Sequence, residues 1–229
     1  MMKKDLRKER EWQRRQEYKK SILQAAEAVI SRKGYGDTTM DDIAREAQFS
    51  KATLYRYFKS KGEVILAIII NYVEELKQRL EEIRGMKMSA KEKLRESIRC
   101  VLQFHEEKEN ISRVFMMDES FMKKMHIFFT GSQKLSSEVD RKFINLIRSK
   151  RKEIFDGACQ MLSEGVEAQE FRKMDIIGAV TILEALLQGY YHGKIGLERK
   201  HDTNTETDLL YNFFFHGIEK KMIEKGDSK

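Results

Sequence analysis

The chain has 229 residues and no proline. At an average usage of about 5%, roughly eleven prolines would be expected. Proline breaks helices because it lacks a backbone N–H and clashes with the preceding turn. Nothing of this kind interrupts the long stretches rich in Glu, Lys, Arg, Leu and Met, which are strong helix formers. The sequence therefore predicts an all-α protein.

Apolar residues recur at helical spacing along most of the chain. The first such stripe predicts a helix that runs through about Lys33 and is stopped by Gly34. Thr39 can cap a second helix, a short third helix is expected over Lys51 to Phe58, and a long helix should end at Gly85. Further helices are expected near 111–129, 134–164 and 175–195, and capping-box patterns at 60–63, 89–92 and 203–206 mark other helix starts. We expect about nine helices in all.

The positive charge of the chain is concentrated near its start. The formal net charge is +7, and residues 1–60 carry 15 Lys and Arg against 9 Asp and Glu, whereas the remaining residues carry 29 against 28. A local basic surplus attracts polyanions, of which nucleic acid is the commonest. A solvated charged helix would explain the same count, so the charge alone leaves both interpretations open.

Residues 39–61 have the pattern of a helix-turn-helix. Two short amphipathic helices share one apolar seam, and the small residues Ala44 and Ala47 let the helix backbones approach closely. The second helix exposes side chains suited to binding phosphates and reading base edges. The seam consists of Ile43, Ala44, Ala47, Phe49, Leu54 and Phe58.

Residues 18–66 closely resemble the DNA-binding domain of the tetracycline-repressor (TetR) family. The positions that carry the resemblance are Thr39, Ile43-Ala44, Ser50-Lys51, Thr53-Leu54-Tyr55, Tyr57-Phe58 and Ser60-Lys61. A weaker match follows at Gly165, Glu170-Phe171, Asp175 and Leu186-Leu187-Gln188-Gly189. The chain departs from the family where Gln48 and Ala52 replace common glycines and where Gly62 replaces a helix former. A non-glycine residue forced to positive φ costs about 1–2 kcal/mol, so the turn at Gln48 is expected to be slightly altered.

The resemblance implies three parts and a function. Residues 1–15 would be a basic N-terminal extension, 16–62 a three-helix helix-turn-helix DNA-binding domain, and 63–229 a helical ligand-sensing and dimerisation domain. The protein would be a transcriptional repressor, released from its operator by a hydrophobic or amphipathic small ligand. The alternative is a DNA-bound adaptor whose body binds another protein. Whether the extension enters a minor groove or is only a disordered or solvated segment stays open.

The resemblance also assigns roles to residues of the helix-turn-helix. Thr39, Tyr57 and Lys61 should hold phosphates, and Tyr55 should contact the backbone or a thymine methyl group. The residues expected to approach the bases are Lys51, Ala52, Thr53 and Arg56. Tyr55 and Tyr57 could instead be core aromatics and Arg56 a solvated charge, whereas Ser50 is more suited to capping.

Such proteins read two half-sites as homodimers, so a palindromic duplex operator and a second copy of the chain are the expected partners. The last two helices are the natural dimer surface, with Ile176, Val180, Leu183, Leu187, Leu210, Phe213, Phe214 and Gly217 as candidates. A ligand pocket is expected among the Phe- and Met-rich middle helices, because Met packs adaptably. The candidate ligand residues are Phe104, His105, Phe115, Phe121, Met122, Met125 and Tyr190. For both sets, the alternative is ordinary intramolecular core.

Other classes of function find little support. The chain has no Gly-rich phosphate loop, no His-Glu-x-x-His run and no Gly-x-Ser-x-Gly, so neither an enzyme, a cofactor nor a metal site is expected. Cys100 and Cys159 are isolated, which favours a reduced compartment and buried apolar roles. The first twenty residues are strongly charged, unlike a secretory signal. The longest apolar stretch, Val64 to Ile70, is too short to span a bilayer, so we expect a cytoplasmic protein.

Overall fold

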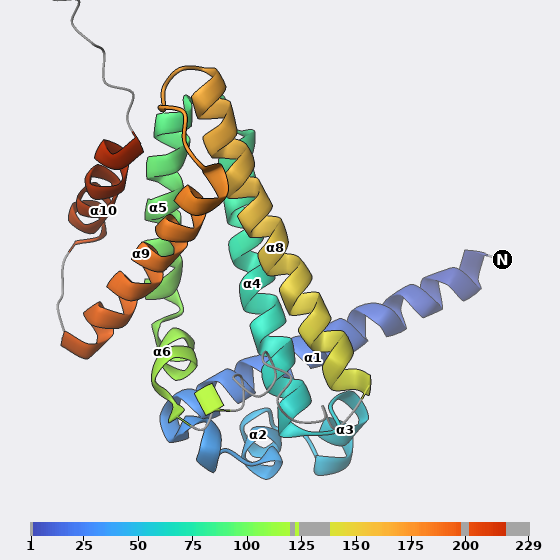
Figure 1. Ribbon diagram of the computed structural model, residues 1–229. Helices are drawn as coiled ribbons and strands as arrows, with labels where there is room; N and C mark the ends of the chain where they lie inside the picture. Colours follow the sequence, from blue (N-terminus) through green and yellow to red (C-terminus); the bar gives the residue numbers. More distant parts are fainter. Residues whose placement is uncertain (1, 120–121, 124–137, 198–201, 219–229) are drawn as a thin grey trace, which may run out of the picture. The chain divides into compact units, whose positions relative to one another are not determined.

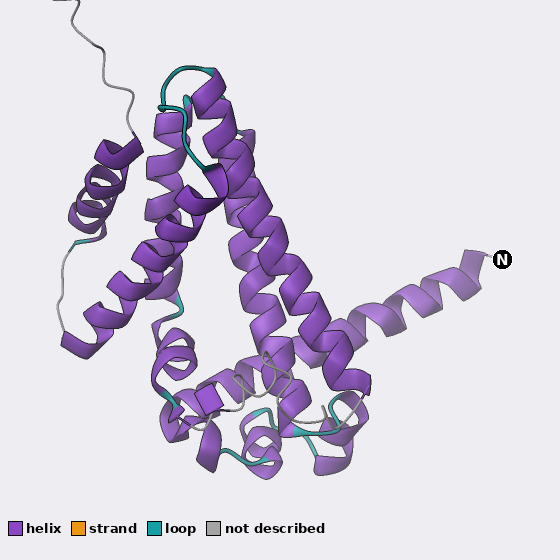
Figure 2. Ribbon diagram, in the orientation of Figure 1, coloured by secondary structure: helices purple, strands orange, loops and turns teal. Residues whose placement is uncertain are grey.

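The computed structural model describes residues 2–119, 122–123, 138–197 and 202–218. Within these residues the chain forms nine helices and no strands. Figure 1 labels the helices along the chain, and Figure 2 shows that only helices and loops are drawn for the described residues. The prediction of an all-α fold is therefore confirmed. Among the described helices, none combines the length and apolar character needed to cross a membrane.

The helices group into two compact units, each of which combines segments that are distant in sequence. Unit 1 consists of residues 1–73 and 108–148, and unit 2 of residues 74–107 and 149–229. This division differs from the boundary expected near residue 62. The reason is that the start of the long fourth helix belongs to the core of unit 1, where Val64, Ile65 and Leu66 are fully buried.

Unit 1 is built around the first three helices, α1 (Met2–Asp37), α2 (Met40–Glu46) and α3 (Lys51–Tyr57), together with α6 (Glu109–Met117). Helix α1 contacts both α2 and α6, and α2 contacts α3. The start of α4 (Lys61–Gly85) and that of α8 (Glu138–Glu167) complete the unit. Its core includes Ile22, Ala26, Ile30, Ile43, Leu54, Phe58, Ile65, Ile68, Ile111, Val114, Ile144 and Ile147.

Unit 2 contains α5 (Ala90–Glu107), α9 (Ile176–Leu197) and α10 (Thr203–Ile218), with the later parts of α4 and α8. Helix α10 packs against both α5 and α9. The core of this unit includes Leu94, Ile98, Leu102, Met161, Leu162, Phe171, Val180, Leu183, Leu210, Phe214, Phe215 and Ile218. The apolar side chains of α10 that belong to this core decide which face of the helix packs against α5 and α9.

The first helix includes the N-terminal extension, and its regular part stops at Gly34. The extension at residues 2–15 is part of the same helix, and its Trp12 is exposed. At the other end Gly34 adopts φ 79° and ψ 162°, which kinks the helix before its last residues. That conformation is nearly restricted to glycine, and it explains why the regular helix stops where the sequence indicated.

The capping patterns had three different outcomes. Ser89 and Glu92 form the expected reciprocal box, with N···O distances of 2.9 and 3.2 Å. At the start of α4, Ser60 Oγ accepts from Glu63 N, but the carboxylate of Glu63 accepts from the N–H of Lys59 rather than that of Ser60. The third pattern is wrong, because Asp202 caps α10 and Glu206 is buried beside Lys194.

Candidate nucleic-acid interface

Each of the two helices of the candidate interface begins with a side-chain N-cap, and a strained turn joins them. Thr39 caps α2 in a capping box with Asp42, and Ser50 caps α3 by accepting a hydrogen bond from Thr53 N at 3.1 Å. Between the helices, Gln48 adopts φ 56°. This is the left-handed region that the sequence predicted would cost a non-glycine residue, so the expected strain is present.

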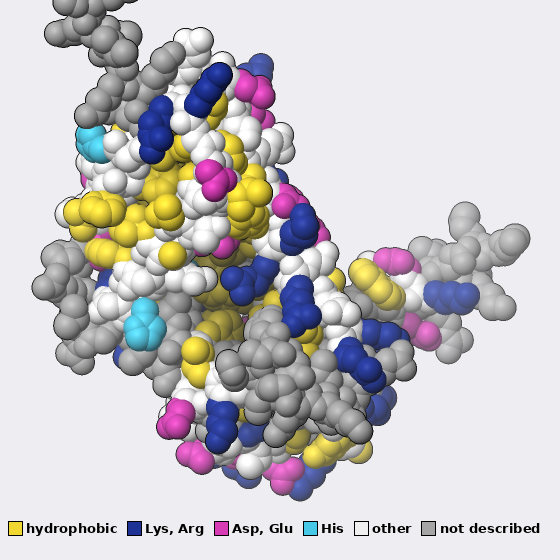
Figure 3. Space-filling model, in the orientation of Figure 1, with side chains coloured by type: hydrophobic (Ala, Val, Ile, Leu, Met, Phe, Trp, Pro, Cys, Tyr) yellow, Lys and Arg dark blue, Asp and Glu magenta, His cyan; other side chains and the backbone are white. Residues whose placement is uncertain are grey.

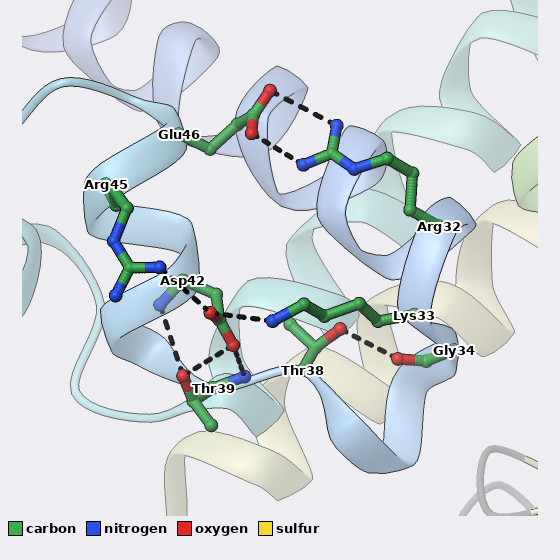
Figure 4. A network of polar contacts seen from close by, with 8 residues as sticks. All are labelled: Arg32, Lys33, Gly34, Thr38, Thr39, Asp42, Arg45 and Glu46. Atoms are coloured by element: carbon green, nitrogen blue, oxygen red, sulfur yellow. Dashed lines mark hydrogen bonds and ion pairs between the residues drawn. The ribbon is translucent and has the colours of Figure 1, made fainter.

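A network of charged side chains holds α2 against α1 (Figure 4). Arg32 donates to Glu46 at 2.6 Å, and Lys33 donates to Asp42 at 2.9 Å. Hydrogen bonds from Lys33 and Thr39 hold the pKa of Asp42 far below its usual range, and the bond from Arg32 lowers that of Glu46. Both carboxylates are therefore charged near neutral pH, and the ion pairs fix the orientation of α2.

Helix α3 divides cleanly into a buried side and an exposed side. Leu54 is fully buried and Phe58, its C-cap, is 5% exposed. The opposite side of the helix is open to solvent and carries Lys51, Ala52, Tyr55 and Arg56. Tyr55 is 43% exposed, so the alternative of a core position does not apply to it. The helix thus offers a row of polar and aromatic groups on a rigid support.

At the end of α3, the half-buried Tyr57 lies beside the exposed Arg56. Tyr57 is half-buried, and its ring lies edge-on to that of Tyr18 on α1, with centroids 6.0 Å apart. The guanidinium carbon of Arg56 lies 5.3 Å from the centroid of the Tyr57 ring. The aromatic ring, which packs against the core, therefore positions the exposed cation.

Several of the expected contact residues already have partners within the chain. Lys51 Nζ lies 2.5 Å from Asp41 Oδ2 in an exposed ion pair. The Thr53 hydroxyl is hydrogen bonded to that of Ser50 at 2.9 Å. The Thr39 hydroxyl donates to Asp42 Oδ2 at 2.7 Å, although the residue is exposed. These side chains are accessible to solvent, but each would have to give up its present partner in order to bind another group.

Lys61 differs from the expectation most clearly. Its ammonium group donates to the carbonyl oxygens of Tyr35 and Gly36 at 2.7 and 2.9 Å, and it lies 4.6 Å from the centroid of the Tyr35 ring. These bonds satisfy carbonyl groups at the end of α1. Lys61 therefore joins α4 to α1, and its side chain is not free to hold a phosphate in this structure.

One exposed cation on this face was not among the expected residues. The side chain of Arg45, in the last turn of α2, is 79% exposed and lies 3.7 Å from Asp42. In helix-turn-helix proteins the first helix crosses the phosphate backbone. The sequence signal was present, since a basic residue follows the apolar pair Ile43-Ala44 on the outer side of the helix.

The residues expected to bind a ligand do not all belong to one unit. In unit 2, Phe104 is buried, and His105 stacks on Tyr191 with ring centroids 4.4 Å apart, while Tyr190 packs against the core. In unit 1, Phe115 lies edge-on to Tyr72, and Met122 is exposed. Phe121 and Met125 lie outside the described residues.

Burial lowers the pKa of His105 to about 4. This imidazole is consequently neutral near pH 7, and its ring packs as an aromatic group rather than as a cation.

The dimerisation residues expected from the sequence differ in how far a single chain buries them. Val180, Leu183, Leu210 and Phe214 are buried in the core of a single chain. Ile176 and Leu187 are half-buried beside that core, whereas Phe213 and Gly217 are exposed. The large apolar side chains that α9 and α10 expose are Ile177, Ile182, Leu209 and Phe213. The stripe facing outward is thus a different one, and Figure 3 shows hydrophobic side chains gathered over these two helices.

The geometry of α2 and α3 is that of a helix-turn-helix, which defines a class of DNA-binding regulators. Residues 22–68 match the family model described as "Bacterial regulatory proteins, tetR family". A relative from Bacillus subtilis, the HTH-type transcriptional regulator YhgD, is 27% identical over 58% of this chain and 66% of its own length. Residues 22–68 therefore form a DNA-binding domain of the TetR family of bacterial regulatory proteins.

Solved structures agree in fold. FadR from Bacillus subtilis in complex with stearoyl-CoA has a TM-score of 0.69 at 22% identity, covering 87% of this chain and 98% of that one. PfmR from Thermus thermophilus, a TetR-family regulator, has a TM-score of 0.65 at 23% identity, covering 87% and 99%. These relatives and neighbours are transcriptional regulators, in agreement with the expectation that the chain is not an enzyme.

Proposed function

We propose that the protein is a homodimeric transcriptional repressor that binds a palindromic operator through α2 and α3 and is released by a hydrophobic or amphipathic small ligand. The observation that carries this proposal is the division of α3 into two sides. Leu54 is fixed in the core, while Lys51, Tyr55 and Arg56 are exposed together on a helix of seven residues. Such a helix can enter a major groove without unfolding.

The exposed groups on α3 and α2 suit different parts of the duplex. Lys51 and Arg56 can donate to guanine O6 and N7, and Ala52 lets the helix come close to the base edges. Tyr55 can contact a phosphate or a thymine methyl group, Thr53 can approach the bases, and Thr39 and Tyr57 can contact phosphates. We add Arg45 to the phosphate contacts because its side chain is 79% exposed. Lys61 contributes to the proposal only by holding α4 and α1 together.

Dimerisation is needed because one helix reads only a few base pairs. Two heads related by a twofold axis would read half-sites whose centres are about 34–36 Å apart or a multiple of that distance. The exposed residues Ile177, Ile182, Leu209 and Phe213 support a dimer surface on α9 and α10. Phe213 is 74% exposed, which is costly for a large aromatic side chain in a lone protomer.

The ligand part of the proposal rests on fewer observations. Phe104, His105 and Tyr190 supply aromatic surface in unit 2, and the neutral imidazole can accept or donate a hydrogen bond to a polar head group. One structural neighbour binds stearoyl-CoA. An amphipathic acyl compound is therefore a reasonable first probe, with Phe115, Phe121, Met122 and Met125 retained as further candidates.

DNA binding is tested by selecting bound sequences from a random duplex pool and measuring affinity for the enriched site by fluorescence anisotropy. Lys51→Ala and Tyr55→Ala should each weaken binding by about 5- to 150-fold, because each removes a contact worth about 1–3 kcal/mol. Lys152→Ala on α8, an equally charged and exposed position, is the control and should bind as wild type. Wild-type affinity in both α3 variants would contradict the proposed contacts.

Dimerisation and ligand release have separate tests. Phe213→Glu should give a monomer by light scattering, whereas Trp12→Glu, which alters an exposed aromatic on α1, should not. Release is tested by titrating stearoyl-CoA into the operator complex, followed by a wider panel of amphipathic compounds. If no compound releases DNA but the body captures a defined protein, the adaptor alternative replaces the ligand part while leaving the DNA contacts intact.

A further inference from the structure

A compact group of charged side chains lies in unit 2 where the end of α5, the end of α9 and the start of α10 meet. Glu106 comes from α5, Lys194 from α9, and Thr203 and Glu206 from α10. None of these residues takes part in the proposed DNA interface. The group was not expected, since the sequence pattern assigned Glu206 to an ordinary capping box.

The carboxylate of Glu206 is the deepest member of the group. The residue is 1% exposed, and its Oε2 accepts a hydrogen bond from Lys194 Nζ at 2.8 Å. Its other oxygen, Oε1, is buried and has no hydrogen-bond partner among the residues that the structure describes. A buried oxygen without a donor is destabilising, and a bound water or ion is one of the explanations for such an atom in a native protein.

The remaining contacts lead from the Glu206 carboxylate, through its Oε2, towards the surface. Lys194 Nζ also donates to Glu106 Oε1 at 2.8 Å, and the Thr203 hydroxyl donates to Glu106 Oε2 at 2.6 Å. The side chain of Glu106 is 39% exposed, whereas that of Lys194 is 16% exposed. The group therefore has a buried acceptor at one end and a solvent-accessible carboxylate at the other.

Among the residues that the structure describes, acidic groups outnumber basic ones at this place. Burial raises the pKa of Glu106, but hydrogen bonds from Lys194 and Thr203 outweigh it, so the carboxyl titrates below its usual range. Burial lowers the pKa of Lys194, but its bonds to Glu106 and Glu206 reverse the direction. Asp202, the cap of α10, adds a third carboxylate close enough to influence Glu106. Among the described residues, this place thus holds three carboxylates and one ammonium group, which is bonded to two of them.

An aromatic pair borders the group. His105 precedes Glu106 on α5, and Tyr191 lies one turn before Lys194 on α9; their rings are stacked, and the Tyr191 hydroxyl donates to the His105 carbonyl at 3.0 Å. Because the imidazole is neutral near pH 7, it adds no positive charge that would repel a cation.

We propose that Glu206 and Glu106 form a binding site for a small organic cation that carries a primary or secondary ammonium group, with one N–H of the ligand donated to Glu206 Oε1. An ammonium group matches both needs of the site, since it supplies a donor to the unpartnered oxygen and a positive charge to the acidic surplus. A cation without N–H groups satisfies only the second need. The inference does not depend on DNA binding, so it can fail or hold by itself.

The test uses the full-length chain without DNA. Thermal unfolding is followed in increasing n-butylamine hydrochloride, with tetramethylammonium chloride and sodium chloride at the same ionic strength. A ligand that binds only the folded state at ten times its dissociation constant should raise Tm by about 3–6 °C in a chain of this size. We expect this rise with n-butylamine and not with the two reference salts.

Variants connect the effect to the site. Glu206→Gln should abolish the rise, and Glu167→Gln, which removes the same charge from an exposed position at the end of α8, should retain it. If Glu206→Gln does not fold, Glu106→Gln replaces it, because Glu106 is partly exposed and its loss should weaken amine binding severalfold. No rise in the wild type, equal rises with tetramethylammonium, or an unchanged rise in the folded site variant would overturn the proposal.

Discussion

The carboxylate of Asp118 accepts a hydrogen bond from the backbone N–H of Tyr35 at 2.6 Å, across 83 residues of sequence. Asp118 is the C-cap of α6, and Tyr35 directly follows the kink of α1 at Gly34. Tyr35 is also the residue whose carbonyl and ring contact Lys61 at the start of α4. The end of α1 is thus a junction of three helices within unit 1, directly before the helix-turn-helix.

Replacing Asp118 tests this junction. Asp118→Ala should lower the free energy of unfolding by about 1–3 kcal/mol, because the N–H of a buried Tyr35 would lose its acceptor. Asp118→Asn keeps an oxygen acceptor and should cost less. The measurement is denaturant unfolding, with Glu119→Ala at the exposed neighbouring position as control. Equal stability of the Ala variant and wild type would show that the bond contributes nothing.

Replacing Gly34 provides a second test of this junction. Its φ of 79° and ψ of 162° are strained for any L side chain, and a Cβ would lie 3.0 Å from Asp118 Oδ2. Gly34→Ala should therefore destabilise the protein by about 1–3 kcal/mol. The loss should be smaller in the Asp118→Ala background, where the close approach is removed. Gly85→Ala, which has open space around its Cβ position, should be neutral or stabilising.

A substitution in the turn between α2 and α3 is predicted to raise the stability of the folded chain. Gln48 has φ 56°, so Gln48→Gly removes a left-handed strain and should stabilise the folded chain by about 0.5–1 kcal/mol after the greater chain entropy of glycine is included. Gln169 has φ 61° and provides a matched change in unit 2. Thermal unfolding of both variants measures the effect. A loss of stability in both would show that the side chains make contacts that outweigh the strain.

The helix-turn-helix could be predicted from sequence because its determinants are local. Thr39 and Ser50 cap helices within four residues of themselves, and Leu54 and Phe58 mark a buried stripe by their spacing. The strain at Gln48 could also be anticipated, since only the residue type at one turn position was needed. Such features do not depend on which distant segment packs nearby.

Glu206, Lys61 and the outer face of α9 could not be assigned in this way. The run from Thr203 to Glu206 has the same pattern as that from Ser89 to Glu92, yet Lys194 on another helix draws Glu206 into the interior. Lys61 is likewise held by carbonyl groups at the end of α1.

Helix α9 shows a further limit of periodicity. It is apolar on most sides, so spacing alone does not tell Ile177, which is 65% exposed, from Val180, which is fully buried. Tertiary packing decides which stripe faces the core.

The ion pair between Lys51 and Asp41 leads to a prediction about affinity. If Lys51 contacts DNA, Asp41 competes for its ammonium group and repels nearby phosphates. Asp41→Asn should then bind the selected operator about 3–10 times more tightly at low salt, and the gain should shrink as ionic strength rises. Asp156→Asn on α8 removes the same charge from unit 2 and should change nothing. An unchanged affinity for Asp41→Asn would place this pair outside the interface.

The pH dependence of the free energy of unfolding should reveal the titration of His105. Its folded-state pKa is lowered by burial from 6.5 to about 4. Between these values the unfolded chain binds a proton that the folded chain does not, so stability is full above about pH 6.5 and falls by roughly 2–3 kcal/mol as the pH drops to 4. His105→Phe keeps a ring against Tyr191 but cannot titrate, so its stability should be flatter over this window. Denaturant unfolding at closely spaced pH values measures the slope, with His192→Gln on the exposed side of α9 as control.

The carboxylates of Asp42 and Glu46, whose pKa values are lowered, lose their contribution to stability as the pH falls further, so their effect and that of His105 occur in different pH ranges. A slope between pH 6.5 and 4 that persists undiminished in His105→Phe would assign the acid sensitivity to another group.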